Sequence, residues 1–138
     1  MERNEIYAVI DTNVLVSALL PTRNVSNPTM VLREVLKGRI TPIYNEEILG
    51  EYLDVLSRDK FHIRKTSIDI VLNHIIQEGI RLDRTPSFEG VFPDPKDVVF
   101  YEVTLSKDDA YLVTGNIKHF PKKPFVVTPA EMVEILGL

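Results

Sequence analysis

Residues 7–15, Tyr-Ala-Val-Ile-Asp-Thr-Asn-Val-Leu, are the stretch that decides the fold of this chain. A short apolar strand pattern ends at Ile10, and Asp11 follows it directly, ahead of a second apolar run. In open α/β folds, a carboxylate behind a buried strand points into the crevice beyond the sheet edge, where ligands bind. We therefore predict that Asp11 lies in a functional crevice. The alternative is that Asp11 only caps a helix beginning near Asn13.

Further polar side chains end apolar segments later in the chain and suggest a shared site with Asp11. They are Glu51, the pair Asp94 and Asp97, and Asn116 behind a Thr-Gly turn. Carboxylates that converge on one crevice repel each other unless a cation is bound, so the sequence suggests a carboxylate-built metal site. Each residue also has a structural alternative. Glu51 could belong to a solvated acidic face and Asp94 could cap a helix. Asp97 could be a favourable charge at a helix start, and Asn116 an ordinary loop residue.

Composition indicates one ordinary globular domain spanning residues 1–138. Hydrophobic residues make up 44% and charged residues 26%, and the absence of cysteine excludes disulfides and thiolate metal sites. The N-terminus lacks the features of a signal peptide, and its longest apolar run stops at Pro21, so we expect a cytoplasmic protein without a membrane segment. A net charge of −4 argues against non-specific coating of nucleic acid, but it does not exclude an enzyme that acts on nucleic acid.

Apolar runs alternate with helical patterns, which predicts an α/β fold with a mostly parallel sheet flanked by helices. The expected strands are residues 6–10, 41–44, 110–114 and 125–127. The expected helices are residues 46–57, 67–78 with Gly79 as its end, and 96–107 with Asp97 in its first turn. Three residues that precede a proline are expected to cap helices: Asn27, Asp94 and Thr128, the last in a capping box with Glu131.

Four motifs, in this order, closely resemble those of PIN-domain nucleases. They are Asp-Thr-Asn-Val-Leu-Val-Ser-Ala-Leu at residues 11–19, Glu-Glu-Ile-Leu-Gly-Glu-Tyr-Leu-Asp-Val-Leu at residues 46–56, Asp-Pro-Lys-Asp at residues 94–97, and Tyr-Leu-Val-Thr-Gly-Asn-Ile-Lys-His-Phe-Pro at residues 111–121. More narrowly, they resemble the prokaryotic subgroup that serves as toxins of toxin–antitoxin pairs. The resemblance covers nearly the whole chain.

The resemblance implies a compact three-layer α/β/α sandwich with a central, mostly parallel sheet. It also implies an endoribonuclease that depends on Mg²⁺ or Mn²⁺, is often a homodimer, and is held inactive by a small antitoxin protein. Divalent cations with oxygen ligands lower the pKa of bound water and clamp phosphoryl oxygens, which is the chemistry that phosphodiester hydrolysis requires.

Carried over by motif, Asp11, Glu51 and Asp97 match the first three catalytic acids of the family. Asp11 and Asp97 are expected to bind the main metal, and Glu51 either to bind a second metal or to orient the attacking water. Asn116 falls where many relatives carry a fourth acid. Its amide, together with a histidine at position 119 where many relatives have another acid, weakens the second metal position. The remaining site residues are expected to line the site or contact substrate phosphates: Thr12, Thr114, Lys118, His119, Lys122 and Lys123.

Competing interpretations differ in their sequence requirements. A haloacid-dehalogenase-type phosphatase needs an acid two residues after the first one, where this chain has Asn13, and a dinucleotide-binding domain needs a glycine-rich turn that is missing. A catalytically weak or inactive PIN-like module that binds protein or RNA stays open because of Asn116. The basic stretch Arg58–Lys65, which contains Phe61, is either a second RNA contact or a solvated loop between helices.

Overall fold

The computed structural model describes residues 5–21, 25–87 and 92–138. Its elements alternate between strands and helices along the chain. In order they are β1 (Ile6–Ile10), α1 (Thr12–Leu19), α2 (Asn27–Leu36), β2 (Ile40–Tyr44), α3 (Glu46–Leu56), the 3-10 turn η1 (Asp59–Phe61), α4 (Lys65–Glu78), β3 (Ile80–Arg81), α5 (Asp97–Thr104), β4 (Ala110–Val113), the 3-10 turn η2 (Ile117–His119), β5 (Val126–Val127) and α6 (Pro129–Ile135).

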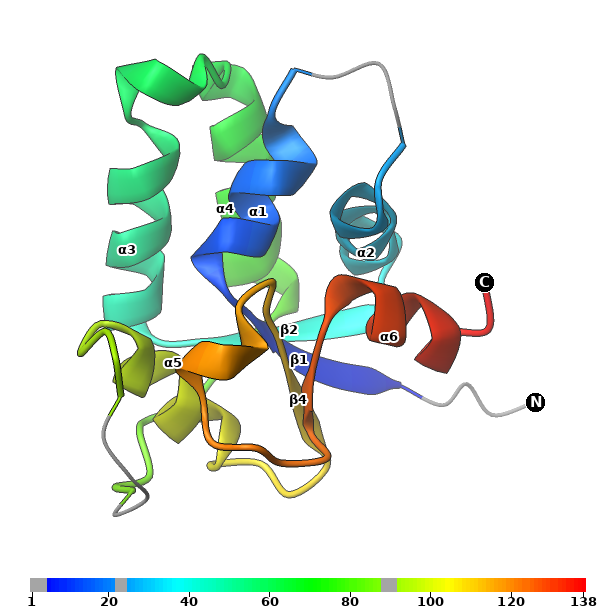
Figure 1. Cartoon of the computed structure of the whole chain (residues 1–138). Helices are drawn as coiled ribbons and strands as arrows, with labels where there is room; N and C mark the ends of the chain where they lie inside the picture. The colour runs from blue at the N-terminus through cyan, green and yellow to red at the C-terminus, as the bar shows by residue number, and fades with distance from the viewer. Residues whose placement is uncertain (1–4, 22–24, 88–91) are drawn as a thin grey trace.

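The sheet has the strand order β3-β2-β1-β4-β5, and every neighbouring pair within the described residues is parallel. The chain moves outward from β1 through β2 to β3, and then crosses back to β4. Because crossovers between parallel strands are right-handed, this reversal places α5 on the face opposite to α1, α2, α3 and α4. Figure 1 shows these four helices above the sheet and α5 below it. The predicted three-layer α/β/α fold is confirmed.

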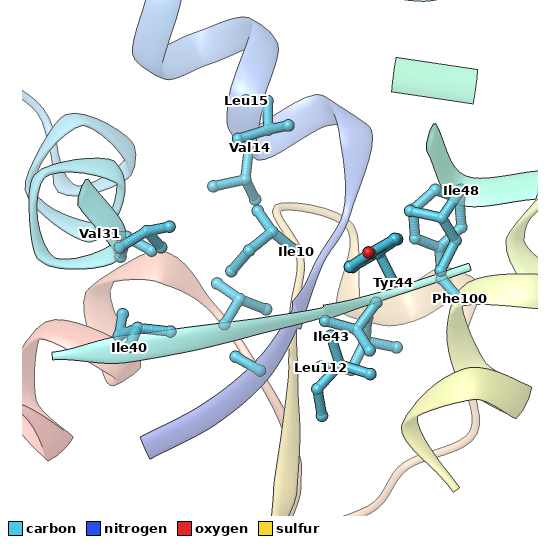
Figure 2. Packing of buried hydrophobic residues seen from close by; sticks show 14 of the residues in the cluster. Ile10, Val14, Leu15, Val31, Ile40, Ile43, Tyr44, Ile48, Phe100 and Leu112 are labelled. Atoms are coloured by element: carbon cyan, nitrogen blue, oxygen red, sulfur yellow. The ribbon is translucent and has the colours of Figure 1, made fainter. Parts of the chain in front are cut away.

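The core lies where the central strands meet the helices above them. Ala8, Val9 and Ile10 of β1 are at most 1% exposed, as is Leu112 of the neighbouring β4. Figure 2 shows Ile10 close to Val14 of α1, at the centre of this cluster. Because central strands of a parallel sheet are covered on both faces, their apolar runs are continuous rather than alternating. This continuity is why the segment before Asp11 could be recognised as a strand.

The four predicted strands are all present, with ends that differ by one residue at β2, β4 and β5. A fifth strand, β3, was not expected, because it is only two residues long and its second residue is Arg81. Helix α5 is shorter than predicted, and α4 begins two residues earlier than expected. Gly79 caps α4 at its C-terminus, as predicted. None of the described helices combines the length and the apolar character needed to cross a bilayer.

Two of the three cap assignments were wrong. Helix α2 is capped by Ser26, whose hydroxyl accepts a hydrogen bond from the Thr29 amide, whereas Asn27 is already the first helical residue. Asp94 does not cap α5: its carboxylate accepts a hydrogen bond from the Lys96 amide in a turn that ends before the helix begins. The capping box at Thr128 is confirmed.

Gly79 lies at a close approach of backbone segments, where α4 ends and β3 begins. A β-carbon at this position would lie 2.7 Å from the Pro42 carbonyl oxygen and closer still to that of Ile75. We expect Gly79→Ala to lower the free energy of unfolding by about 1–3 kcal/mol, because neither backbone atom can move like a side chain. Gly50, inside α3, has nothing within 4 Å of such a carbon, so Gly50→Ala should stabilise by about 0.5–1 kcal/mol. Urea unfolding measures both changes, and equal effects would contradict this account.

Candidate active site

The site is built where β1 and β4 lie side by side and the chain leaves the sheet in opposite directions from them. In the parallel register Ile10 is opposite Val113, so the residues that follow, Asp11 and Thr114, become neighbours although 103 positions separate them. The Asp11 amide donates to the Val113 carbonyl at 2.9 Å, which extends the pairing by one step. Open α/β sheets bind ligands at such a switch point, beyond the carboxyl ends of the strands.

Asp11 is almost fully buried, with 5% of its surface exposed. Its Oδ2 accepts hydrogen bonds from the Thr114 hydroxyl at 2.7 Å and from the Asn13 side-chain amide at 3.0 Å. The pKa of Asp11 is raised to about 6. Burial is the largest cause, the hydrogen bond from Thr114 opposes it, and the charge of the nearby Asp97 adds to it. The side chain makes no capping hydrogen bond to α1, although Asp11 is the N-cap residue by position.

Asn13 is a site residue that sequence reasoning missed. Its amide nitrogen donates to Asp11, and its amide oxygen accepts a hydrogen bond from the Gly115 backbone at 3.1 Å. Asn13 therefore ties the β1–α1 connection to the loop behind β4. The sequence had singled out this position only as the place where an acid is missing. Its hydrogen bond with Gly115, 102 positions away, leaves no recognisable pattern in the sequence around Asn13.

A cleft of about 330 Å³ opens beside Asp11 and gathers most of the predicted site residues. Glu51 reaches it from α3, Asp97 from the first turn of α5, and Asn116 from the loop between β4 and η2. Phe61, from the basic stretch, also lines it. The other residues around the cleft are Thr12, Asn13, Val16, Ser17, Val55, Asp94, Lys96, Phe100 and His119.

The acids in the cleft influence one another electrostatically. Partial burial raises the pKa of Asp97, and the charges of Asp94 and Glu51 raise it further. His119 opposes this shift, because its Nδ1 lies 3.3 Å from Asp97 Oδ2. His119 was expected to contact substrate, whereas in this structure its described partner is Asp97. The mutual repulsion that the sequence suggested is therefore present around Asp97.

Two sets of contacts, one buried and one partly exposed, join the elements that carry the acids. The hydroxyl of Tyr52, on α3, donates to the carbonyl of Ile10, the residue before Asp11. Arg84 donates to Glu102 of α5 at 2.6 Å and to Glu47 of α3 at 3.0 Å, so it joins the two helices that carry Asp97 and Glu51. Neither contact was predicted, because each joins residues that are far apart in sequence.

The donor set fits a hard divalent cation, because carboxylate and amide oxygens are its preferred ligands. Within residues 5–21, 25–87 and 92–138, however, no three Asp, Glu or His side chains stand close enough together to hold one metal ion. Mg²⁺ commonly retains several waters and takes only one or two carboxylates directly. Two carboxylates, such as those of Asp11 and Asp97, would therefore be enough protein ligands for such a cation.

The remaining predicted residues are not all brought to the cleft. Thr12 lines it, and its hydroxyl is buried without a hydrogen-bond partner among the described residues. Thr114 is fully buried and acts on the site through its hydrogen bonds to Asp11 and to the Asn116 amide. The lysines of the expected phosphate-binding group line a separate hollow instead: Lys118, Lys122 and Lys123.

A family model described as a PIN domain matches residues 7–118, which is most of the chain. The chain therefore belongs to the PIN-domain family. Members of this family are generally nucleases, hydrolases that act on nucleic acid. No curated protein and no solved structure gave a significant match.

The raised pKa of Asp11 predicts that Asp11→Asn stabilises the metal-free protein at alkaline pH. A carboxyl whose pKa rises from 3.8 to about 6 on folding contributes stability that is present below pH 3.8 and is lost as the pH rises through 6. At pH 8 the variant should be more stable than the parent by up to about 3 kcal/mol, because it keeps the acceptor oxygen without the buried charge.

Urea unfolding in chelator at pH 4.5 and pH 8 measures this difference, which should shrink at the lower pH. Asp69→Asn, an exposed acid on α4, is the matched control and should show no comparable change. A parent as stable as the Asp11 variant at pH 8 would show that burial of Asp11 does not oppose its ionisation.

Proposed function

We propose that this protein is an endoribonuclease dependent on Mg²⁺ or Mn²⁺ that cleaves RNA phosphodiesters, and that it is the toxin of a type II toxin–antitoxin pair. One observation carries the nuclease proposal: Asp11 is buried at the switch point of the sheet, and Glu51, Asp97 and Asn116 surround the same cleft. These residues belong to the four motifs that resemble those of the toxin subgroup, and the toxin proposal is supported by this resemblance. The small inhibitory partner and the homodimer rest on this resemblance alone.

In this proposal Asp11 and Asp97 hold the cation. The bound cation would supply an activated water and neutralise charge on the phosphate. Asp11 is fixed in orientation by Thr114 and Asn13, so its carboxylate needs little rearrangement on binding. His119 holds Asp97 from the side of the η2 turn. The two strongest proposed ligands are thus each positioned by neighbouring side chains.

Glu51 and Asn116 have the supporting roles in the proposed reaction. Glu51 lines the cleft from α3 and would accept a hydrogen bond from the attacking water, which orients the water toward phosphorus. Asn116 is exposed, and its backbone amide is held by the Thr114 hydroxyl at 3.0 Å. Its side-chain amide would donate a hydrogen bond to a phosphate oxygen, which an acid at this position could not do at neutral pH.

The second candidate function is a catalytically weak module that works by binding protein or RNA. Two observations favour it: the amide at position 116, and the absence of a close three-acid group among the described residues. The burial of Asp11 opposes it. A buried charge at a ligand-binding edge lowers stability unless it serves a bound cation, and a pure binding module gains nothing from keeping it.

Purified protein should cleave single-stranded RNA in Mn²⁺ or Mg²⁺ and should stop in chelator. Asp11→Asn and Asp97→Asn should each lower the cleavage rate at least about a hundredfold, because each removes an anionic ligand while keeping the side-chain shape. The rate is measured on a labelled oligonucleotide separated by gel electrophoresis. Asp69→Asn, on the outer surface of α4, should cut at the parental rate.

Loss of cleavage in both site variants also excludes a contaminating ribonuclease, which would cut in every preparation alike. Equal rates for the parent and both site variants would refute the proposed active site. A parent that binds RNA but does not cut it with any divalent cation would support the binding module instead.

Asn116→Asp should tighten divalent-cation binding about tenfold, because an anionic ligand attracts the cation more strongly than an amide oxygen does. Calorimetric titration with Mn²⁺ compares the two proteins without depending on catalysis. Asn73→Asp, on the exposed face of α4, is the matched control and should leave the affinity unchanged. If Asn116→Asp also leaves the affinity unchanged, Asn116 does not face the cation.

A further inference from the structure

A second hollow of about 330 Å³ lies next to the cleft, across the η2 turn. In a 3-10 turn, side chains three positions apart lie on the same side. Asn116 and His119 accordingly line the cleft, whereas Ile117 and Phe120 line the hollow. The turn (orange in Figure 1) thus forms a ridge that contributes side chains to both depressions. A ligand that extends out of the cleft over this ridge would enter the hollow.

The walls of the hollow are well supported. The Phe120 ring packs edge-on against Phe92, with ring centroids 6.1 Å apart, and Phe92 packs in the same way on Tyr101 at 5.6 Å. The backbone of η2 is closed by a hydrogen bond from the Phe120 amide to the Ile117 carbonyl at 3.2 Å. The hollow is therefore part of the fixed structure, and no rearrangement is needed to form it.

The lining of the hollow combines apolar side chains with cations. Ile117 is 43% exposed, so its side chain is accessible to a ligand in the hollow. Lys118, Lys122 and Lys123 stand around it. In a chain with a net charge of −4, three lysines within six positions form a local basic surface. An apolar floor with a basic rim matches a ligand that has a flat apolar part and negative charges beside it.

We propose that this hollow receives an unpaired base of the RNA strand whose scissile phosphate lies in the cleft, while its lysines contact the adjoining phosphates. The inference rests on the proposed function and extends it by naming the part of the substrate that is bound outside the reaction centre. Single-stranded RNA offers splayed bases that pack on apolar and aromatic side chains, and phosphates that attract lysine. The basic rim favours a nucleotide over an apolar protein segment.

Two labelled probes of about 12 nucleotides test the proposal: a mixed-sequence single-stranded RNA, and an abasic ribose–phosphate oligomer of equal length and charge. Binding is measured by fluorescence anisotropy in chelator, so that no cleavage occurs. The parent should bind the RNA about tenfold more tightly than the abasic oligomer. Ile117→Ser should lose most of this preference. Lys122→Gln should weaken binding of both probes and lower the salt slope by about 0.7, while keeping the preference.

Ile70→Ser is the matched control, because Ile70 is an exposed isoleucine on α4, 63% exposed, and does not line the hollow. It should bind both probes as the parent does. Circular dichroism melting establishes that each variant is folded. The proposal is overturned if the parent binds the two probes equally, or if Ile117→Ser keeps the parental preference, as it would if the hollow served a protein partner.

Cleavage in Mn²⁺ is measured separately on the same RNA, so the two proposals can fail independently. If the protein cleaves RNA but shows no preference for RNA over the abasic oligomer, the base-binding proposal is refuted and the nuclease proposal stands. If the protein prefers RNA over the abasic oligomer through Ile117 but does not cleave it, the base-binding proposal is supported and the nuclease proposal is refuted. If the protein neither binds nor cleaves RNA, both proposals are refuted.

Discussion

The structure depends on one constraint: a carboxylate, Asp11, is buried at the point where the two central strands end. Burial of a charge in a protein interior is unfavourable unless hydrogen bonds or a cation compensate it. Thr114 and Asn13 supply two hydrogen bonds to the same oxygen, yet the pKa of Asp11 still rises to about 6. The compensation within the chain is therefore incomplete, which is the condition under which a cation would add most to stability.

This constraint explains contacts that the core alone would not require. Glu51 and Asp97 reach the cleft from helices that lie on opposite faces of the sheet, so their separation depends on how α3 and α5 are joined. Arg84 joins them through Glu47 and Glu102, and charge-assisted hydrogen bonds of this kind are the stronger ones. Glu102 is itself buried, so its contact with Arg84 is partly shielded from solvent, whereas the contact between Arg84 and Glu47 is exposed. The geometry of the acids is thus set from outside the cleft.

Local sequence signals predicted the fold well and the site in part. The apolar run before Asp11 and the periodic pattern of α4 are long enough to identify their elements, whereas β3 has two residues and leaves no pattern. The prediction of a helix cap failed where two suitable residues are adjacent, as with Ser26 and Asn27, because backbone angles determine which of the two caps the helix. Helical periodicity alone does not tell which apolar residues are buried: Leu53 of α3 is 53% exposed, since neighbouring helices decide which face is covered.

The site residues that were missed share one property: their partners lie far away along the chain. Asn13 and Arg84 act through residues 102 and 18 positions away, and only the strand order and the helix layers bring these together. A residue type gives no sign of such a partner. The motif resemblance located the acids, but it could not reveal what holds them, and the lysines near Asn116 in sequence turned out to face a different depression.

The separation of acids and lysines has a consequence for how an acidic protein could act on a polyanion. Among the described residues, the cleft is lined by Asp11, Glu51, Asp94 and Asp97 and by one lysine, Lys96, so without a cation it repels phosphate. The lysines across the η2 ridge attract phosphate whether or not a cation is bound. Under the proposed function, the two surfaces have different roles. The basic hollow binds the RNA strand, and only the cation-loaded cleft admits the scissile phosphate.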